Sequence, residues 1–334
     1  MIQHRNLFID GKWACRCFLA SVLLAHAILA GAQPAQAPYP NRPIKVLVGV
    51  PPGGSTDLIA RIFAAWLQTE MGQPTIVDNR PGANTTVAAT TVANESPDGY
   101  TLLVATDAII TAPLLGKLQY DPFKDFVPVG TLTVSPFVFA VHPSLPINSV
   151  KDLIAFAKAH PDELNYGTSG NGGGSHLGGE KFKMLTGTRI VHVPYRGAGP
   201  ALTDAISGQV QLSLWTPLAI APHVKANKLR PLAVTGAKRV PYLPQVPTFA
   251  EVGLPQYDHK TWIGVYARKG TPQPIVDRIG AEIAKMLSAP KIRHKLEESG
   301  AEPLVSTPAQ FTQMMRTESS ELVKLIKAAN IRMD

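Results

Sequence analysis

The regular alternation of short apolar runs with amphipathic stretches is the feature that most limits how this chain can fold. Residues 44–50 form an apolar run of strand type, and apolar side chains then recur at helical spacing from Leu58 to Leu67. The pattern continues with a strand over 74–77, a small-residue helix over 84–93 and a strand over 100–105. This β-α-β-α-β order is typical of a parallel sheet covered by helices.

The alternation resumes after a long apolar segment, residues 126–141. It predicts helices over 150–159, 175–185 and 200–206, and strands over 164–167, 189–193, 210–215, 229–234 and 262–267. The last part, residues 272–331, is predicted to be mostly helical and to pack back on the first block. We therefore expect an α/β fold with lobe one formed by residues 38–135 and 262–334 and lobe two by 136–261.

The first 37 residues have the three-part pattern of a secretory signal peptide. Basic side chains come first, an apolar run follows over residues 17–30, and small residues then offer cleavage after Ala32 or Ala37. The run is too short to cross a bilayer comfortably, although an uncleaved N-terminal anchor is the alternative reading. No other stretch approaches eighteen consecutive apolar residues, so the mature protein is expected to be soluble and periplasmic.

Cysteine content and charge narrow the function further. Cys15 and Cys17 both lie in the predicted signal peptide, so the mature chain is expected to have no disulfide, thiol nucleophile or Cys-ligated metal. Removing residues 1–37 lowers the formal net charge from +8 to +6. The remaining basic residues are scattered and form no basic stripe with aromatic residues, so we expect no nucleic-acid partner.

Two glycine-rich loops, one in each block, follow predicted strands and begin predicted helices. They are residues 52–57 (PGGSTD) and residues 167–176 (GTSGNGGGSH). The unpaired backbone N–H groups and the positive end of the dipole at a helix N-terminus can bind a carboxylate or phosphate without a cationic side chain. Each loop could equally be an ordinary turn with a serine N-cap.

Sharper motifs are absent from the sequence. The P-loop, the dinucleotide-binding fingerprint and the Gly-x-Ser-x-Gly nucleophile elbow all fail at their required spacings. The histidines show no metal-ligand spacing, and no pair of carboxylates indicates acid–base chemistry. The sequence therefore predicts no cofactor, no metal and no catalytic residue.

A series of motifs along almost the whole mature chain resembles the Bug family of periplasmic binding proteins, the receptors of tripartite tricarboxylate transporters. The motifs occur in the family's order and together are specific, although no single one would be. They lie at residues 39–45 with 52–57, 78–83, 96–102, 166–172 with 176–177, 193–197, 200–204, 208–210, 228–234 and 246–248.

The resemblance implies a type II periplasmic-binding-protein fold, in which two Rossmann-like lobes joined by two crossover strands close on a ligand. It implies a small carboxylate ligand (a dicarboxylate, a tricarboxylate, an acidic amino acid or an aromatic acid), two integral-membrane transporter subunits as partners, and a monomer. Carried over by position, the expected ligand-binding residues are Gly53, Gly54, Ser55, Thr56 and Asp107 of lobe one, and Ser169, Gly170, Asn171, Gly172, His176, Tyr195, Arg196 and Gly197 of lobe two.

The sequence departs from the family pattern at positions that bear on the ligand. Residues 49–51 replace a segment that often contains an aromatic residue, and Gly173 stands where a hydroxyl residue is common. Asp107 follows a predicted strand where small residues are usual, and it would repel a second ligand carboxylate. Trp215 could be a core residue or line the cleft, and Arg196 could bind a carboxylate or lie on the surface.

Two other functions fit parts of the sequence. A periplasmic sensor for a signalling partner would carry the same motifs. A hydrolase using Ser169 or Ser175 would need a histidine and an acid placed to activate the serine, and His176 next to Ser175 is not enough.

Overall fold

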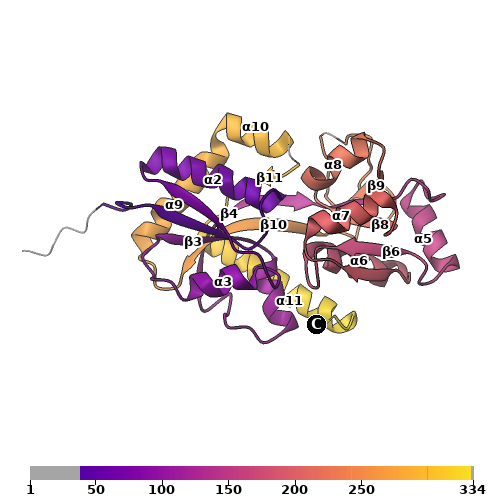
Figure 1. The fold of residues 1–334 in the computed structure, drawn as a ribbon, viewed down its shortest axis with the longest axis horizontal. Helices are drawn as coiled ribbons and strands as arrows, with labels where there is room; N and C mark the ends of the chain where they lie inside the picture. Colours follow the sequence, from indigo (N-terminus) through magenta and orange to yellow (C-terminus); the bar gives the residue numbers. More distant parts are fainter. Residues whose placement is uncertain (1–37, 242, 299, 332–334) are drawn as a thin grey trace, which may run out of the picture. The chain divides into compact units, whose positions relative to one another are not determined.

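The computed structural model describes residues 38–331 apart from residues 242 and 299. The predicted signal peptide lies outside the described residues. The contacts between Cα atoms group the chain into two units, residues 1–41 and residues 42–334. All the helices and strands described below belong to the second unit. They form an α/β fold with two sheets and helices on both faces of each (Figure 1).

The first sheet has the strand order β11-β4-β10-β3-β1-β2. Strand β1 pairs in parallel with β2 and β3, whereas β10 is antiparallel to β3 and β4. The parallel part matches the βαβαβ unit that the sequence predicts. The strands are β1 (Ile44–Val48), β2 (Thr75–Asn79), β3 (Thr101–Thr106), β4 (Phe126–Pro136), β10 (Lys260–Arg268) and β11 (Glu302–Pro303).

The second sheet has the strand order β7-β6-β8-β5-β9. Strand β6 is parallel to β7 and β8, and β5 is antiparallel to β8 and β9. Its strands are β5 (Val138–Val141), β6 (Asn165–Thr168), β7 (Val191–Pro194), β8 (Leu212–Trp215) and β9 (Arg230–Val234).

The helices begin and end where the sequence supplies caps. Ser149 accepts a hydrogen bond from the Asp152 N–H at the start of α5, and Thr307 and Gln310 form a capping box at the start of α11. Gly72 ends α2 in a left-handed conformation, φ +70°. The helices are α2 (Ser55–Met71), α3 (Thr86–Ala93), α4 (Ala108–Leu115), α5 (Val150–Ala159), α6 (Gly174–Thr186), α7 (Ala198–Ser207), α8 (Pro217–Lys225), α9 (Gln273–Ser288), α10 (Pro290–Glu298) and α11 (Pro308–Ala328).

Alternate residues of β5 serve two different cores. Phe139 and Val141 pack under α5 and α6, whereas Val138 and Ala140 pack under α7 and α8. Because successive side chains of a strand point to opposite faces, a buried sheet needs apolar residues at every position. This explains why residues 126–141, read as one long apolar segment, form two consecutive strands, β4 and β5, in different sheets.

The chain passes from the first sheet to the second between β4 and β5, and it returns in the segment that leads into β10. These passages are the two crossovers of a type II periplasmic-binding-protein fold, as the sequence predicts. The lobe boundaries at 135/136 and 261/262 stay a prediction.

The C-terminal helix α11 packs against lobe one and also reaches the second lobe. Its residues Phe311, Met315 and Leu322 share an apolar cluster with Leu177 of α6, a fully buried residue of the second lobe. Ile331, just after α11, belongs to the same cluster. The tail therefore packs on the strands and helices around β1 and β3, and it adds an apolar contact with the second sheet's helix α6.

The sequence analysis did not predict helix α4. The helix carries Pro113 and is buried over Ala108–Ala112, so it shows no amphipathic pattern. It follows Asp107 directly, and its backbone therefore fixes where that acidic side chain lies.

Replacing Leu177 with alanine should lower the free energy of unfolding by about 3 kcal/mol, because it removes a fully buried side chain and leaves a cavity between α6 and α11. Urea unfolding checks this. Leu185→Ala on the same helix is the matched control: that side chain is 39% exposed, and its loss should cost under about 0.5 kcal/mol. Equal effects of the two substitutions would contradict the assignment of Leu177 to the contact between the lobes.

Candidate functional site

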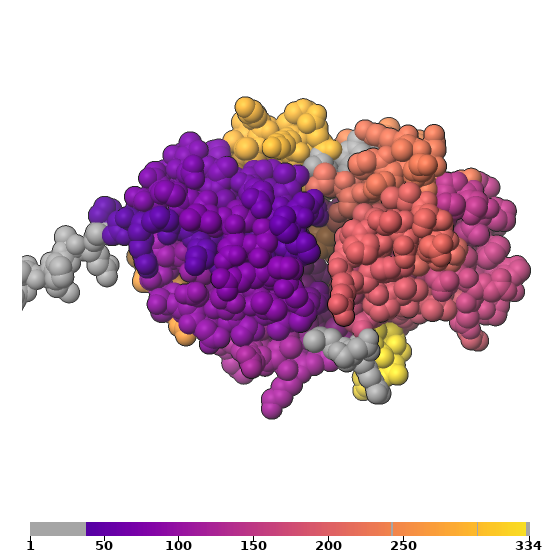
Figure 2. Space-filling model, in the orientation of Figure 1, coloured from indigo at the N-terminus to yellow at the C-terminus, as the bar shows by residue number. Residues whose placement is uncertain are grey.

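Three of the predicted ligand-binding glycines, Gly53, Gly54 and Gly197, border open space near the carboxyl ends of parallel strands, where ligands bind in open α/β sheets. No described atom lies within 4 Å of the position that a Cβ would take at Gly53, Gly54 or Gly197. Figure 2 shows a groove between the indigo and purple surface of the first lobe and the red surface of the second. The first loop therefore has room for a ligand beside it, whereas Gly170 and Gly172 of the second loop are packed against Tyr195 and Leu115.

The first loop is held by a buried aspartate. Asp57 accepts hydrogen bonds from the Gly53 N–H (2.9 Å), from Arg61 Nε (2.9 Å) and from Asn79 Nδ2 (2.8 Å). Asn79 Nδ2 also donates to the Val50 carbonyl at 3.0 Å. The sequence motif at residues 78–83 therefore fixes the backbone of the glycine loop.

Burial would raise the pKa of Asp57, but the hydrogen bonds from Arg61, Gly53 and Asn79 outweigh it and hold the pKa below its ordinary value. A carboxyl group with a lowered folded-state pKa stabilises the fold above its unfolded pKa, and this stabilisation is lost as pH falls through the folded value. Asp57 is thus an ionised anchor of the loop at neutral pH.

A second feature of lobe one, a left-handed turn before α3, was missed by the sequence analysis. Ala83, Asn84 and Thr85 have φ of +43°, +49° and +72° in succession. The turn packs on Gly49, where a Cβ would come within 2.5 Å of the Thr85 methyl group. This close approach explains the glycine at position 49. Consecutive left-handed residues other than glycine are uncommon and are found at functional sites.

This left-handed turn faces the second loop across the lobes. A Cβ at Gly172 would lie 3.6 Å from Asn84 Nδ2 and 2.1 Å from Leu115. Asn84 Nδ2 is a buried donor that makes no hydrogen bond with any described atom. The family motif at residues 78–83 ends one residue before Asn84, and no local signal in the sequence marked Asn84 as a donor.

The second loop is shaped by hydrogen bonds to histidines. The Gly172 N–H donates to His176 Nδ1 at 3.0 Å, and Thr168 Oγ1 lies 2.6 Å from His192 Nε2. The His176 and His192 rings stack with their centroids 3.7 Å apart. Burial, and then the charges of His176 and Lys183, lower the pKa of His192 to about 3, so its ring is neutral. His176, a predicted ligand contact, therefore uses one ring nitrogen to hold the loop.

Helix α6 begins at the end of this loop without a side-chain cap. Its N-cap is Gly173, which has no side chain to accept a hydrogen bond from the first turn. Ser175, in that turn, is 3% exposed, and its Oγ has no partner among the described residues. The first amides of α6 and the Ser175 hydroxyl thus keep hydrogen-bonding capacity beside the groove.

Both crossovers contact this first turn of α6. His259 Nε2 donates to the Gly174 carbonyl at 2.7 Å, and the His259 ring stacks on Phe137 with centroids 5.0 Å apart. Burial is the main cause that lowers the pKa of His259 to about 4, so the ring is neutral. The neutral ring holds the first turn of α6 against the segment that leads into β10.

Asp107 lies where β3, β10 and α6 meet. It is 3% exposed, and its Oδ1 accepts a hydrogen bond from Thr261 Oγ1 at 2.6 Å. Its Oδ2 lies 3.7 Å from the position of a Cβ at Gly174, in the first turn of α6. Burial raises the pKa of Asp107 to about 6 despite the Thr261 hydrogen bond.

The remaining lobe-two candidates differ in what they can offer a ligand. The Tyr195 hydroxyl donates to Asp204 at 2.7 Å, and burial together with this bond raises the pKa of Tyr195 to about 12. The Gly197 N–H donates to the Ser169 carbonyl at 3.2 Å, and Arg196 is exposed. Trp215 is a core residue, 6% exposed, yet its Nε1 has no partner among the described residues.

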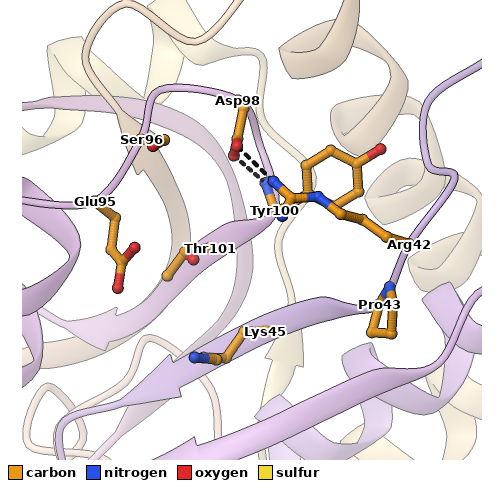
Figure 3. Close-up of a pocket in the computed structure, with 8 residues that line it drawn as sticks. All are labelled: Arg42, Pro43, Lys45, Glu95, Ser96, Asp98, Tyr100 and Thr101. Atoms are coloured by element: carbon orange, nitrogen blue, oxygen red, sulfur yellow. Dashed lines mark hydrogen bonds and ion pairs between the residues drawn. The ribbon is translucent and has the colours of Figure 1, made fainter. Parts of the chain in front are cut away.

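Described residues also line two polar hollows. One of about 440 Å³ is lined by Asn171 and His176, two predicted ligand-binding residues, together with Glu180, Lys183, His192, Pro194 and residues 329–331. The other, of about 230 Å³, lies at the starts of β1 and β3 and is shown in Figure 3.

The hollow of Figure 3 brings together the sequence motifs at 39–45 and 96–102. Arg42 Nη2 donates to Asp98 Oδ2 at 2.7 Å, and the guanidinium lies 4.2 Å from the centre of the Tyr100 ring. Because these contacts lie at the amino ends of the parallel strands, the two motifs fasten the beginning of lobe one and take no part in the groove.

In the described part of the chain, no three His, Cys, Asp or Glu side chains are arranged to hold a metal ion. Among residues 38–331, leaving aside 242 and 299, no helix combines the length and the apolar character needed to cross a membrane.

Two sheets joined by two crossovers, with glycine loops on each side of a groove, define a type II periplasmic binding protein. Residues 59–331 match the family model described as "Tripartite tricarboxylate transporter family receptor". BugT of Bordetella pertussis is 34% identical over 298 residues, which cover 88% of this chain and 91% of BugT.

Solved structures agree in both sequence and fold. The structure "R. palustris Rpa4515 with adipate" is 39% identical in sequence to this chain and superposes with a TM-score of 0.84. The match covers 89% of this chain and 100% of the Rpa4515 chain. MatC (Rpa3494) from Rhodopseudomonas palustris with bound malate is 31% identical, with a TM-score of 0.79, over 86% and 100%. The chain therefore belongs to the tripartite tricarboxylate transporter receptor family, and the predicted resemblance to Bug proteins is confirmed.

Asn79→Ala should loosen the first glycine loop, because it removes the bonds from Nδ2 to Asp57 and to the Val50 carbonyl. At about 1 kcal/mol for each bond, exchange of the Gly53, Gly54 and Ser55 amides should become roughly tenfold faster or more. Hydrogen–deuterium exchange measures this. Asn94→Ala, which removes a bond to Thr90 at the exposed end of α3, should leave the loop unchanged. Unaltered exchange in Asn79→Ala would show that Asn79 does not hold the loop.

Proposed function

We propose that this protein is an exported, periplasmic receptor that binds a small carboxylate in the groove between its lobes and delivers it to two integral-membrane subunits of a tripartite tricarboxylate transporter. The observation that carries this proposal is the uncapped first turn of α6, which lies opposite the left-handed turn at residues 83–85.

The first turn of α6 suits an anion for two reasons. Its backbone N–H groups lack intrahelical acceptors, and the helix dipole adds the equivalent of about half a positive charge at this end. In most helices an Asn, Asp, Ser or Thr side chain satisfies these amides, but Gly173 has no side chain to do so. A ligand carboxylate would supply the missing acceptor.

Unpaired polar atoms on both sides of the groove support the same reading. Asn84 Nδ2 from lobe one and Ser175 Oγ from lobe two are buried without a partner among the described residues. Leaving a buried donor unsatisfied costs about 1–3 kcal/mol, so such atoms usually have a water or ligand partner. An oxygen-rich ligand between the lobes would satisfy both.

Relatives support the ligand class and the transport role. The Rpa4515 and MatC structures contain adipate and malate, both of which are carboxylates. Hinged closure about the two crossovers would enclose such a ligand, since both crossovers contact the α6 turn that is proposed to bind it.

The same contacts favour binding without catalysis. The Ser175 hydroxyl makes no hydrogen bond with a described histidine, whereas a serine nucleophile needs an adjacent base. The His176 ring accepts a bond from the Gly172 amide, which suits a positioning role in the loop.

A thermal-shift screen of the mature protein with mono-, di- and tricarboxylates and acidic amino acids tests the proposal. A ligand at a hundred times its dissociation constant stabilises the folded state by about 2.7 kcal/mol, so the melting temperature should rise by a few degrees. If every carboxylate class leaves the melting temperature unchanged, the proposed function is wrong.

Asn84→Asp should lower the affinity for the best carboxylate found in that screen by about 10-fold to 100-fold. The substitution replaces a buried donor with an acceptor of the same shape. Asparagine and aspartate both tolerate the left-handed conformation, so the turn should persist. Isothermal titration calorimetry measures the change. Asn227→Asp is the matched control, since Asn227 also has a positive φ (+54°) but is exposed on the second lobe. Equal affinities of the two variants would exclude Asn84 from the ligand site.

A further inference from the structure

Asp107 and Asp57 are both buried acids in the first lobe, and their surroundings differ sharply. Asp57 has an arginine, an asparagine side chain and a backbone amide as donors. Asp107 forms no ion pair within the described residues; it accepts bonds from the Thr261 and Thr106 hydroxyls and from its own N–H. A buried carboxylate without a cation is costly unless a proton or another donor reaches it.

The groups that face Asp107 offer no positive charge. Thr261 and Tyr266 of β10 are neutral, and so is Tyr120 beyond α4. Glu318 of α11 is a second acid that interacts electrostatically with Asp107. Burial, then the charge of Asp107, and further Glu321, raise the pKa of Glu318 to about 8. These groups disfavour additional negative charge at this point.

The position of Asp107 brings this acid to the proposed ligand. Its Oδ2 lies next to Gly174 in the uncapped first turn of α6, at the contact between the lobes. A carboxylate bound at that turn would therefore have Asp107 as a neighbour on the lobe-one side. Whatever group of the ligand meets Asp107 has to donate a hydrogen bond.

We propose that Asp107 determines specificity: the ligand carries a hydrogen-bond donor, such as an ammonium or hydroxyl group, where a plain dicarboxylate carries its second carboxylate. This inference rests on the proposed function and deepens it. It names amino or hydroxy monocarboxylic acids as the preferred class and makes unsubstituted dicarboxylates poor ligands at neutral pH.

Protonation should modify the preference in a defined direction. Since burial raises the pKa of Asp107 to about 6, the side chain is ionised at pH 8 and largely protonated near pH 5. A protonated carboxyl can donate to a ligand carboxylate, so dicarboxylates should bind better as pH falls through about 6. Replacing Asp107 with asparagine supplies a permanent donor of the same shape and should remove this pH dependence.

The test uses ligands matched in length. For chains of four, five and six carbons, the affinity of the dicarboxylate is compared with those of the ω-amino and ω-hydroxy monocarboxylate, at pH 8 and pH 5.5, by calorimetry. We expect the native protein to prefer a donor-bearing ligand over the matching dicarboxylate at least tenfold at pH 8. This ratio should shrink at pH 5.5. Asp107→Asn should lower the ratio at pH 8 at least tenfold, whereas Asp152→Asn on α5 should leave it unchanged.

Each outcome bears on one of the two proposals. If no ligand binds the native protein at either pH, the proposed function fails. If carboxylates bind but the native protein prefers the dicarboxylate at pH 8, or Asp107→Asn leaves the ratio unchanged, the role of Asp107 is wrong while the receptor function stands. The pH dependence of the native protein needs no variant, so poor folding of Asp107→Asn would still leave the inference open to disproof.

Discussion

The first turn of α6 can lie against both crossovers only because glycines leave space there. A Cβ at Gly174 would come within 2.8 Å of the Phe137 ring, and one at Gly178 within 2.7 Å of the His259 ring. The hydrogen bond from His259 to the Gly174 carbonyl then fixes the helix end to the segment that leads into β10. The proposed anion site and the hinge are therefore parts of one packed unit, so closure of the lobes and occupation of the helix end would be coupled.

The two buried aspartates of lobe one show how local surroundings assign different roles to the same side chain. Asp57 is surrounded by donors and acts as an ionised anchor for the first glycine loop. Asp107 forms no ion pair within the described residues and interacts with the charge of Glu318, so its charge depends on pH. One acid thus holds the first loop, and the other is the acid proposed to face the ligand.

The family motifs mostly support the scaffold. Residues 39–45 and 96–102 meet at the base of lobe one through Arg42, Asp98 and Tyr100, and residues 78–83 hold the first loop through Asn79. Positions that depart from the family pattern, such as Asp107 and Trp215, lie at the carboxyl ends of strands β3 and β8. This division suits a fold that keeps its architecture while its ligand varies.

The amino-acid sequence by itself determined the alternation of strands and helices, the two glycine loops and the family, because apolar periodicity and turn residues act over a few neighbouring positions. Helix α4 was not predicted, because it is buried over consecutive residues and its sequence has no helical periodicity of apolar and polar residues. Only the tertiary structure decided that Asn84 faces Gly172, that α11 reaches Leu177 in the other lobe, and that Asp107 has no cationic partner within residues 38–331, leaving aside 242 and 299. These relations join residues far apart in the chain, and they arise from packing that no local pattern encodes.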